Sequence, residues 1–168
     1  MTRFFSEALG KHERASFASG NERIDAYFRH TVTQDIKRNY AGCYVLVERD
    51  SLDVAGFYTL SSYMIPLTDL PAELARKLPR YPNIPAVLIG WLGRDLRFRG
   101  AQVGPMLLYD AIARIASSPV GAHAICADAI DPAASAFYQE HQFRPFVSRP
   151  NSLFLPIKTA LTRAASNK

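Results

Sequence analysis

Apolar positions along the chain recur at two spacings, one typical of helices and one typical of strands. Residues 22–39 carry apolar side chains at helical spacing, and Asn21 stands before them as a plausible N-cap. Residues 43–48 and 54–61 are instead rich in β-branched and aromatic side chains, and a polar turn cluster separates them. The pattern predicts a helix followed by a β-hairpin.

The rest of the chain predicts further short elements. Residues 4–20 are irregular in pattern, and the tail after Thr159 is either a short basic helix or frayed. Five prolines in residues 66–85 exclude a long helix or a central strand and leave room for a short helix over 72–78. The remaining predictions are strands over 86–96, 122–127, 143–148 and 152–157 and helices over 105–117 and 132–141, the last with Asp131 as N-cap and Pro132 at N1.

This order of elements indicates the fold class. A strand, a helix and a second strand in succession imply a parallel pair with a crossover helix, and hairpins on either side imply antiparallel pairing. We therefore predict an α/β protein with a mixed, mostly antiparallel sheet around a central parallel strand pair. A length of 168 residues favours one domain over 1–168.

Composition and charge narrow the class further. Hydrophobic residues make up 48% and charged residues 21%, the formal charge is +5, and the pI is about 9.4. No apolar run could span a bilayer and no signal core opens the chain, so we expect a cytoplasmic protein. Cys43 and Cys126 lie in apolar segments without zinc-ligand spacing, which indicates two buried, reduced thiols and no metal site. The excess of basic over acidic residues fits either a polyanionic partner or an ordinary solvated surface.

Candidate chemistry gathers in the turn between the predicted strand 86–96 and the helix that follows. A strand-to-helix turn presents backbone N–H groups to a phosphate, and the helix dipole favours the same charge. Arg97 and Arg99 add positive charge there. Taken by itself, a glycine-containing turn of this kind is usually an ordinary connection between a strand and a helix.

With Arg99, Gln102 and Gly104 in register, the turn resembles the pyrophosphate motif of the Gcn5-related N-acetyltransferase (GNAT) family. The chain departs from that motif at Gln102, where the family has glycine, which demands an altered backbone or weakens cofactor binding. Pro105 also removes one N–H donor.

The resemblance extends from about residue 17 to residue 157 and is nearest to the toxin branch of this family, found in toxin–antitoxin pairs. It rests jointly on residues 17–21, the aromatic pair Tyr27 and Phe28, the strand 56–61, the proline-bounded segment 70–79, the Leu-Gly-Arg strand end 92–94, and residues 128–131 leading to 136–138.

The resemblance implies a site for acetyl-CoA in a splayed gap between two parallel strands. Backbone groups of Leu92, Gly93 and Arg94 would pair with the pantetheine arm, and a backbone N–H would polarise the thioester carbonyl. Tyr138 would be the general acid that protonates the departing thiolate. The other implied cofactor-binding residues are Arg99, Gly100, Ala101, Gln102, Val103, Gly104 and Asp131.

The acceptor that the resemblance implies is the α-amine of the amino acid on charged tRNA, whose acetylation blocks translation. The four histidines form no recognisable dyad. An α-amine, with a pKa near 8, needs less help from a base than a lysine amine. Arg76, Lys77 and Arg97 are predicted to bind the substrate, and Arg80, Arg94 and Arg99 are further candidates for an RNA-facing surface. A ribbon-helix-helix antitoxin and a homodimer are expected partners.

Two other readings remain open. The chain could be a stand-alone N-acetyltransferase of a small amine or a protein. It could also be a degenerate member whose Gln102 and Pro105 have spoiled the cofactor site, acting through binding alone.

Overall fold

The computed structural model describes residues 1–166, which form two compact units. One unit comprises residues 1–61 and 90–113, and the other comprises residues 62–89 and the chain from residue 114 onward. The strands run in the order β1-β2-β3-β4-β5-β7-β6, and β4 and β5 form the parallel pair. The predicted α/β class with a mixed, mostly antiparallel sheet is confirmed, and the single domain stays a prediction.

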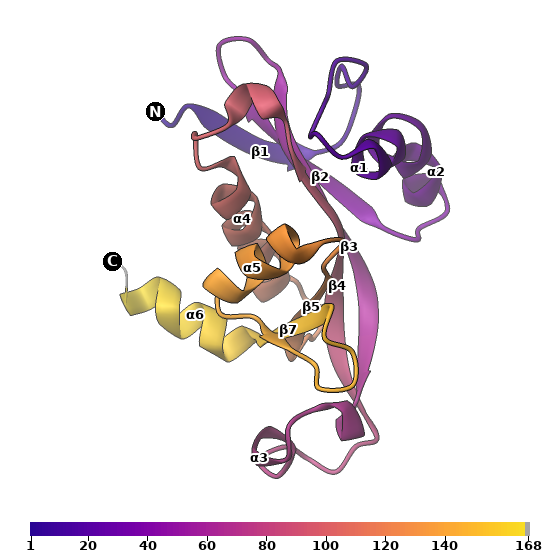
Figure 1. Cartoon of the computed structure of the whole chain (residues 1–168), viewed down its shortest axis with the longest axis vertical. Helices are drawn as coiled ribbons and strands as arrows, with labels where there is room; N and C mark the ends of the chain where they lie inside the picture. The colour runs from indigo at the N-terminus through magenta and orange to yellow at the C-terminus, as the bar shows by residue number, and fades with distance from the viewer. Residues whose placement is uncertain (167–168) are drawn as a thin grey trace. The chain divides into compact units, whose positions relative to one another are not determined.

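The first unit begins with a strand where the pattern suggested irregular chain. β1 (Phe4–Ala8) pairs antiparallel with β2 (Gly42–Glu48), as Figure 1 shows, so the irregular reading of residues 4–20 was wrong for its first part. Only one side chain of β1 is buried, so its sequence shows little of the alternation between apolar and polar residues that would indicate a strand. β2 then pairs with β3 (Val54–Pro66), which is five residues longer than the predicted 54–61.

The predicted helix over 22–39 is present with an internal irregularity. It consists of α1 (Glu22–Ala26), the π-helical turn η1 (Tyr27–Thr31) and α2 (Val32–Lys37). Asn21 caps it by accepting from the N–H groups of Arg23 (3.0 Å) and Ile24 (3.2 Å), as predicted. Its apolar face packs with β2 and β3 in one core cluster, centred on Phe28 and Phe57, whose rings stack at 4.1 Å.

The second unit contains the parallel pair. β4 (Asn83–Arg94) runs beside β5 (Ala124–Asp128) in the register Ala86↔Ala124 to Ile89↔Ala127. β5 pairs antiparallel with β7 (Ser152–Pro156), which Figure 1 shows at its side. β6 (Arg144–Pro145) is much shorter than the predicted strand 143–148. On its N-terminal side Phe143 N–H donates to the Tyr138 carbonyl oxygen of α5 (3.0 Å), and on its C-terminal side a single further bond runs from Phe146 N–H to the Ser152 carbonyl oxygen (2.9 Å).

The proline-rich segment extends the strands on both sides instead of interrupting them. β3 continues to Pro66, a short helical turn η2 (Leu67–Asp69) and α3 (Ala72–Ala75) follow, and β4 already includes Pro85. The prediction that residues 66–85 contain no central strand was therefore wrong at both ends. Pro85 fits because its carbonyl oxygen accepts from His123 N–H (2.8 Å), a role that needs no N–H of its own.

Three longer helices complete the fold: α4 (Val103–Ser117), α5 (Pro132–Glu140) and α6 (Ile157–Ser166). The tail is thus helical as far as residue 166, and residues 167–168 lie outside the described residues. None of the helices described in residues 1–166 is long and apolar enough to cross a membrane. Cys43 and Cys126 are buried free thiols, as predicted, and burial raises the pKa of each to about 12.

Candidate active site

The strand end that was predicted to hold the pantetheine arm is closely packed in the first unit. A Cβ atom on Gly93 would lie 2.7 Å from a methyl group of Ile24 and 3.0 Å from the ring of Phe57, so glycine is required there. The Arg94 Nε atom is buried and has no hydrogen-bond partner among the described residues. An unpaired buried donor is uncommon in folded proteins and marks this strand end as a place where the protein leaves a polar group unsatisfied.

A side chain supports the strand just before that end. The backbone N–H of Trp91 donates to the side-chain hydroxyl of the buried Thr59 (3.0 Å). This bond helps to hold the backbone directly before Leu92.

The turn after the strand contains two residues in left-handed backbone. Gly100 has φ +82° and Gln102 has φ +62°. Gln102 thus adopts the conformation that glycine adopts without steric penalty, in the position where the family has glycine. The backbone of the turn is therefore kept in the glycine-type conformation, at a steric cost to Gln102.

The turn opens into α4 two residues earlier than predicted. Val103 is the first helical residue, and Met106 donates from its N–H to the Gln102 carbonyl oxygen (3.1 Å). Pro105 therefore occupies the third helical position and not the first. The N–H groups of Val103 and Gly104 belong to the first turn, which has no intrahelical acceptors. The space beside Gly100 is open, because a Cβ atom added to this residue would meet no described atom within 4 Å.

Two arginines carry positive charge near the turn, and they differ in their surroundings. Arg99 is exposed at the turn. Arg97 directs its guanidinium to Asp95, with Nε 3.0 Å from Oδ1, and lies 3.4 Å from the carboxylate of Asp53. Its predicted role in substrate binding stays a prediction, and in this structure its charge is paired within the protein.

Tyr138 lies on α5 in the second unit. The side chain is only 5% exposed, and its ring contacts those of Phe137 (5.3 Å) and Phe143 (5.2 Å). Burial, with a smaller contribution from the charge of Asp128, raises the pKa of Tyr138. The hydroxyl is therefore protonated at neutral pH and can donate.

Two adjacent aromatic residues on α5 differ in burial. Tyr138 is buried, whereas Phe137 is half-buried. The ring of Phe137 lies against that of His141, one turn on in the chain, at 4.7 Å. This local pair covers part of Phe137 without placing it in the core.

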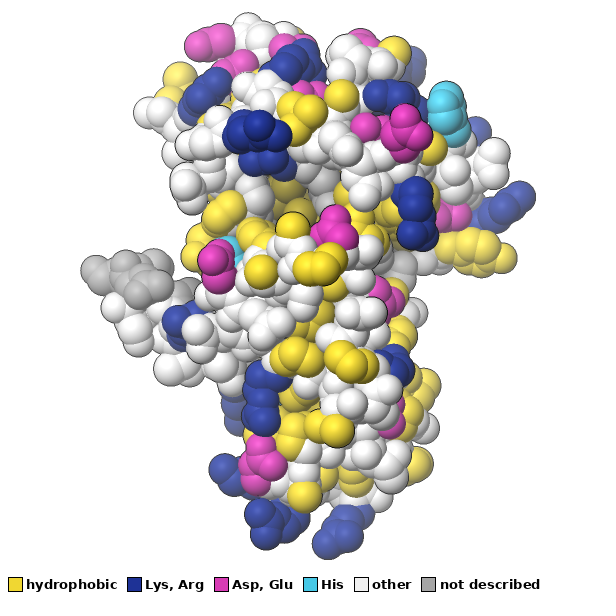
Figure 2. All heavy atoms as spheres, in the orientation of Figure 1, with side chains coloured by type: hydrophobic (Ala, Val, Ile, Leu, Met, Phe, Trp, Pro, Cys, Tyr) yellow, Lys and Arg dark blue, Asp and Glu magenta, His cyan; other side chains and the backbone are white. Residues whose placement is uncertain are grey.

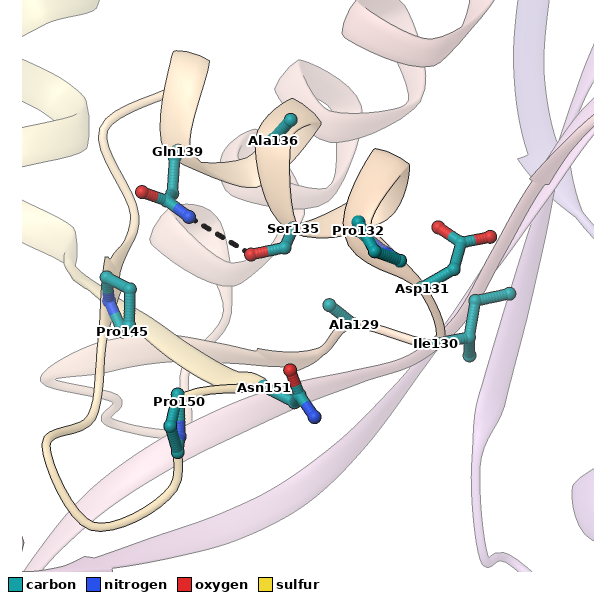
Figure 3. Close-up of a pocket in the computed structure, with 10 residues that line it drawn as sticks. All are labelled: Ala129, Ile130, Asp131, Pro132, Ser135, Ala136, Gln139, Pro145, Pro150 and Asn151. Carbon is teal, nitrogen blue, oxygen red and sulfur yellow. Dashed lines mark hydrogen bonds between the residues drawn. The ribbon is translucent and has the colours of Figure 1, made fainter.

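Asp131 caps α5 as predicted. Its Oδ1 atom accepts from Ala134 N–H at 2.7 Å, and Pro132 occupies the first helical position. Asp131 also lines an open hollow of about 640 Å³ beside α5, drawn in Figure 3. The other residues lining the hollow are small or uncharged, among them Ser135, Gln139 and Asn151, and Ser135 accepts a hydrogen bond from Gln139 (3.0 Å). The hollow thus has no cation for a phosphate, and Asp131 stays a predicted cofactor contact.

The remaining predicted substrate contacts, Arg76 and Lys77, follow α3 in the second unit. Both are exposed, as is Arg80. Figure 2 shows lysine and arginine side chains gathered over α3, at the bottom of the view. An exposed basic cluster of this kind suits a polyanion.

One histidine has a carboxylate partner that the sequence did not reveal. His12 Nε2 lies 2.7 Å from a carboxylate oxygen of Glu7, and its Nδ1 accepts from Gly10 N–H (3.0 Å). Both ring nitrogens are thus engaged locally, so His12 is not available as a general base. In residues 1–166 no group of three or more His, Cys, Asp or Glu side chains is placed to hold a metal ion.

Sequence reasoning missed Asp95, which is 1% exposed and caps the short helix η3 (Leu96–Phe98). Its side chain accepts from Arg97 N–H at 2.8 Å. The available signal was an acid directly before a turn that contains arginine, a weak pattern beside the stronger glycine pattern that follows it.

Comparison with known proteins places this fold and site in a family. No family model matches the chain. A probable toxin TacT from Sinorhizobium fredii is 35% identical over 158 residues, which cover 89% of this chain and 87% of that protein.

Three solved structures share the fold over nearly the whole chain. AtaT complexed with acetyl-methionyl-tRNAfMet has a TM-score of 0.86 at 26% identity, covering 96% of this chain and 99% of AtaT. A tyrosine-to-phenylalanine variant of KacT has a TM-score of 0.88 at 25% identity, covering 96% and 99%. AtaTR bound with AcCoA has a TM-score of 0.83 at 26% identity, covering 98% and 99%. The chain therefore belongs to the TacT, AtaT and KacT family of GNAT-fold, acetyl-CoA-dependent acetyltransferase toxins of toxin–antitoxin systems.

Proposed function

We propose that this chain transfers the acetyl group of acetyl-CoA to the α-amine of the amino acid on charged tRNA and thereby blocks translation. The observation that carries the proposal is the turn of residues 99–104, where Gly100 and Gln102 keep left-handed backbone at the start of the 15-residue helix α4. This geometry suits a pyrophosphate, and AtaT has been solved with acetyl-methionyl-tRNAfMet.

The residues of the turn and the strand end fit acetyl-CoA. N–H groups of Val103 and Gly104 would bind the pyrophosphate, and the exposed Arg99 would add charge. Gly100 leaves room for a phosphate to approach the backbone. Leu92, Gly93 and Arg94 would hold the pantetheine arm, with the unpaired Arg94 Nε as an additional donor. When bound, acetyl-CoA supplies an activated acetyl group and a thiolate leaving group.

Tyr138 is proposed as the proton donor to that thiolate. Its raised pKa keeps the phenol in the protonated form that a donor needs. The same shift makes Tyr138 a weaker acid, so its hydroxyl would first stabilise the departing sulfur by hydrogen bonding. As the C–S bond breaks and the N–C bond forms, Tyr138 would give its proton to the sulfur, and the proton lost by the acceptor amine would pass through solvent and replace it. The tyrosine-to-phenylalanine variant of KacT is consistent with a functional tyrosine in this family.

The acceptor proposal rests on two features of the chain. His12, the histidine that has a carboxylate partner, uses both ring nitrogens locally, which favours an acceptor that is partly neutral at pH 7, as an α-amine is. The exposed Arg76 and Lys77 beside α3 offer the positive charge that a tRNA backbone requires. An antitoxin of the ribbon-helix-helix type is the partner that would restrain this activity.

The degenerate, binding-only reading is less favoured. Gln102 and Pro105 were the residues that could spoil the cofactor turn, yet Gln102 adopts a glycine-type backbone. Pro105, at the third helical position, removes one N–H donor, but Val103 and Gly104 before it keep theirs. A stand-alone acetyltransferase of small amines or proteins remains the second candidate, because the cofactor turn would be the same.

The deciding experiment incubates the protein with radiolabelled acetyl-CoA and total charged tRNA, followed by mass spectrometry of the nuclease-released aminoacyl adenosine. N-acetylated aminoacyl adenosine is the expected product, and deacylated tRNA is the matched control. Label incorporated only into added proteins or polyamines would favour the stand-alone acetyltransferase. Absence of acetyl-CoA binding by calorimetry at millimolar cofactor would contradict every enzymatic reading.

A further inference from the structure

A buried carboxylate stands directly before the cofactor turn and has no counterpart in the proposed chemistry. The side chain of Asp95 is 1% exposed. It accepts from Arg97 N–H (2.8 Å), Arg97 Nε (3.0 Å) and Arg97 Nη2 (3.1 Å), and also from Ala18 N–H (3.2 Å). A buried carboxylate with four donors is fully compensated and holds those donors in one arrangement.

The backbone around Asp95 joins three separate segments of the first unit. Asp95 N–H donates to the Ala55 carbonyl oxygen (2.8 Å), and Leu96 N–H donates to the Ala18 carbonyl oxygen (2.9 Å). Arg97 extends the network to Asp53 in the hairpin turn (3.4 Å). The exit of β4 is therefore held to the N-terminal segment and to the start of β3.

The network ends where the backbone becomes strained. Phe98, the last residue of η3, is buried against Phe4 with ring centroids 5.8 Å apart. Gly100 and Gln102 follow with positive φ. A non-glycine residue stays in left-handed backbone only where its surroundings hold it there. In this turn, the backbone on the N-terminal side is held by the hydrogen bonds of Asp95.

We infer that Asp95 is a positioning residue for the cofactor: with Arg97 it holds the turn of residues 99–104 in the conformation that binds the pyrophosphate of acetyl-CoA. This inference rests on the proposed function of the turn. It also assigns Arg97 to the turn itself and not to the RNA-facing surface, because its guanidinium already lies between Asp95 and Asp53.

The test compares Asp95→Asn, Arg97→Gln and the double variant with the wild-type chain. Asp50→Asn, an exposed acid of the same hairpin turn as Asp53, is the matched control. Calorimetry gives the Kd for acetyl-CoA, steady-state kinetics give KM for each substrate and kcat, and circular dichroism establishes the temperature range in which each variant is folded.

We expect Asp95→Asn and Arg97→Gln each to raise the Kd and KM for acetyl-CoA by about tenfold or more, with KM for charged tRNA changed less than about twofold. Because the two side chains act as a pair, the double variant should be little worse than either single one. A purely structural role would lower the melting temperature but leave the Kd of the folded protein unchanged, and that result would overturn the inference.

Other outcomes are equally decisive. If Arg97→Gln raises KM for charged tRNA and leaves the Kd for acetyl-CoA unchanged, Arg97 contacts RNA and the inference is wrong. If Asp95→Asn does not fold, Arg97→Gln alone carries the test, since it removes the partner without leaving an unsatisfied N–H of the turn. Failure of the wild-type chain to bind acetyl-CoA contradicts the proposed function itself, whereas wild-type binding with unaltered variants contradicts only the role of Asp95.

Discussion

The turn of residues 95–104 and the helix α5 differ in what they expose and in what holds them in place. The turn is exposed at Arg99, offers backbone N–H groups, and owes its shape to ion pairs and left-handed backbone. Helix α5 instead carries one buried aromatic side chain, Tyr138, which is held by apolar ring contacts and a capped N-terminus. In the proposed function, one region would present main chain to the cofactor, and the other a single side-chain hydroxyl.

This difference decides which substitutions each region tolerates. A backbone site depends on φ and ψ, so Gln102 can stand in place of glycine provided that it adopts the same conformation. The role proposed for Tyr138 depends on one functional group, so no other residue would replace its hydroxyl. Gln102, which departs from the glycine of the family motif, is therefore compatible with an intact turn.

The largest expected effect comes from Tyr138→Phe, which removes the donor and leaves the ring. We expect kcat to fall by about 100-fold to 10,000-fold, the usual contribution of general acid catalysis, with an unchanged Kd for acetyl-CoA. Single-turnover acetylation of charged tRNA measures the first quantity and calorimetry the second. The exposed Tyr81→Phe is the control, and equal activity of Tyr138→Phe and wild type would remove Tyr138 from the mechanism.

The pH dependence of the same reaction follows from the direction of the Tyr138 shift. Its pKa lies above the ordinary value of about 10, so the donor stays protonated throughout the range in which the amine loses its proton. The rate should rise with pH to about 8, as the α-amine becomes neutral, and then level off without a decline below about pH 10. A decline near pH 7 would point to a different acid.

The next largest effect is expected from Gly93→Ala at the end of β4. The added Cβ would lie 2.7 Å from Ile24 and 3.0 Å from Phe57, both within the core of the first unit. Overpacking of this kind costs about 1–3 kcal/mol, which a shift of the urea midpoint measures. Gly121→Ala, where no atom lies within 4 Å, is the matched control and should be close to neutral. A neutral Gly93→Ala would mean that the strand end is looser than its contacts indicate.

A smaller effect is expected at the cap of α5. Asp131→Ala removes the acceptor of Ala134 N–H and should lower the free energy of unfolding by about 1 kcal/mol, whereas Asp131→Asn should retain most of it. Urea unfolding compares the two. If Asp131 also accepts a hydrogen bond from the cofactor, as predicted from the family, the Kd for acetyl-CoA will rise in Asp131→Ala, which lacks the acceptor, and less in Asp131→Asn, which keeps one.

The smallest effect is expected from Gln102→Gly, and it tests the comparison directly. Glycine relieves the steric cost of φ +62°, so the free energy of unfolding should rise by up to about 1 kcal/mol, offset in part by the greater freedom of the unfolded chain. The Kd for acetyl-CoA should change by less than about threefold. Gln102→Val, with a branched side chain, should destabilise the protein instead. A large gain in affinity with glycine would show that Gln102 does impair the turn.

Much of the fold could be predicted from local pattern, and the misses have physical causes. The helix after Asn21 and the cap at Asp131 were predicted correctly, because capping depends on neighbouring residues. β1 was missed because it buries little and is defined by its partner β2. Pro85 was misplaced because proline disrupts a strand only where its absent N–H is needed, which depends on the neighbouring strand.

For the candidate site, the sequence by itself determined the chemistry on offer: a glycine-containing turn before a helix, a Leu-Gly-Arg strand end, a tyrosine on the following helix, and an excess of basic residues. Only the tertiary structure decided the backbone conformation of Gln102, the burial of Tyr138 in preference to Phe137, and the pairing of Arg97 with Asp53. The reason is that residue types and short-range spacing are properties of the chain, whereas backbone strain, burial and ion pairing arise from contacts between segments distant in sequence, as Ala18, Asp53 and Asp95 are.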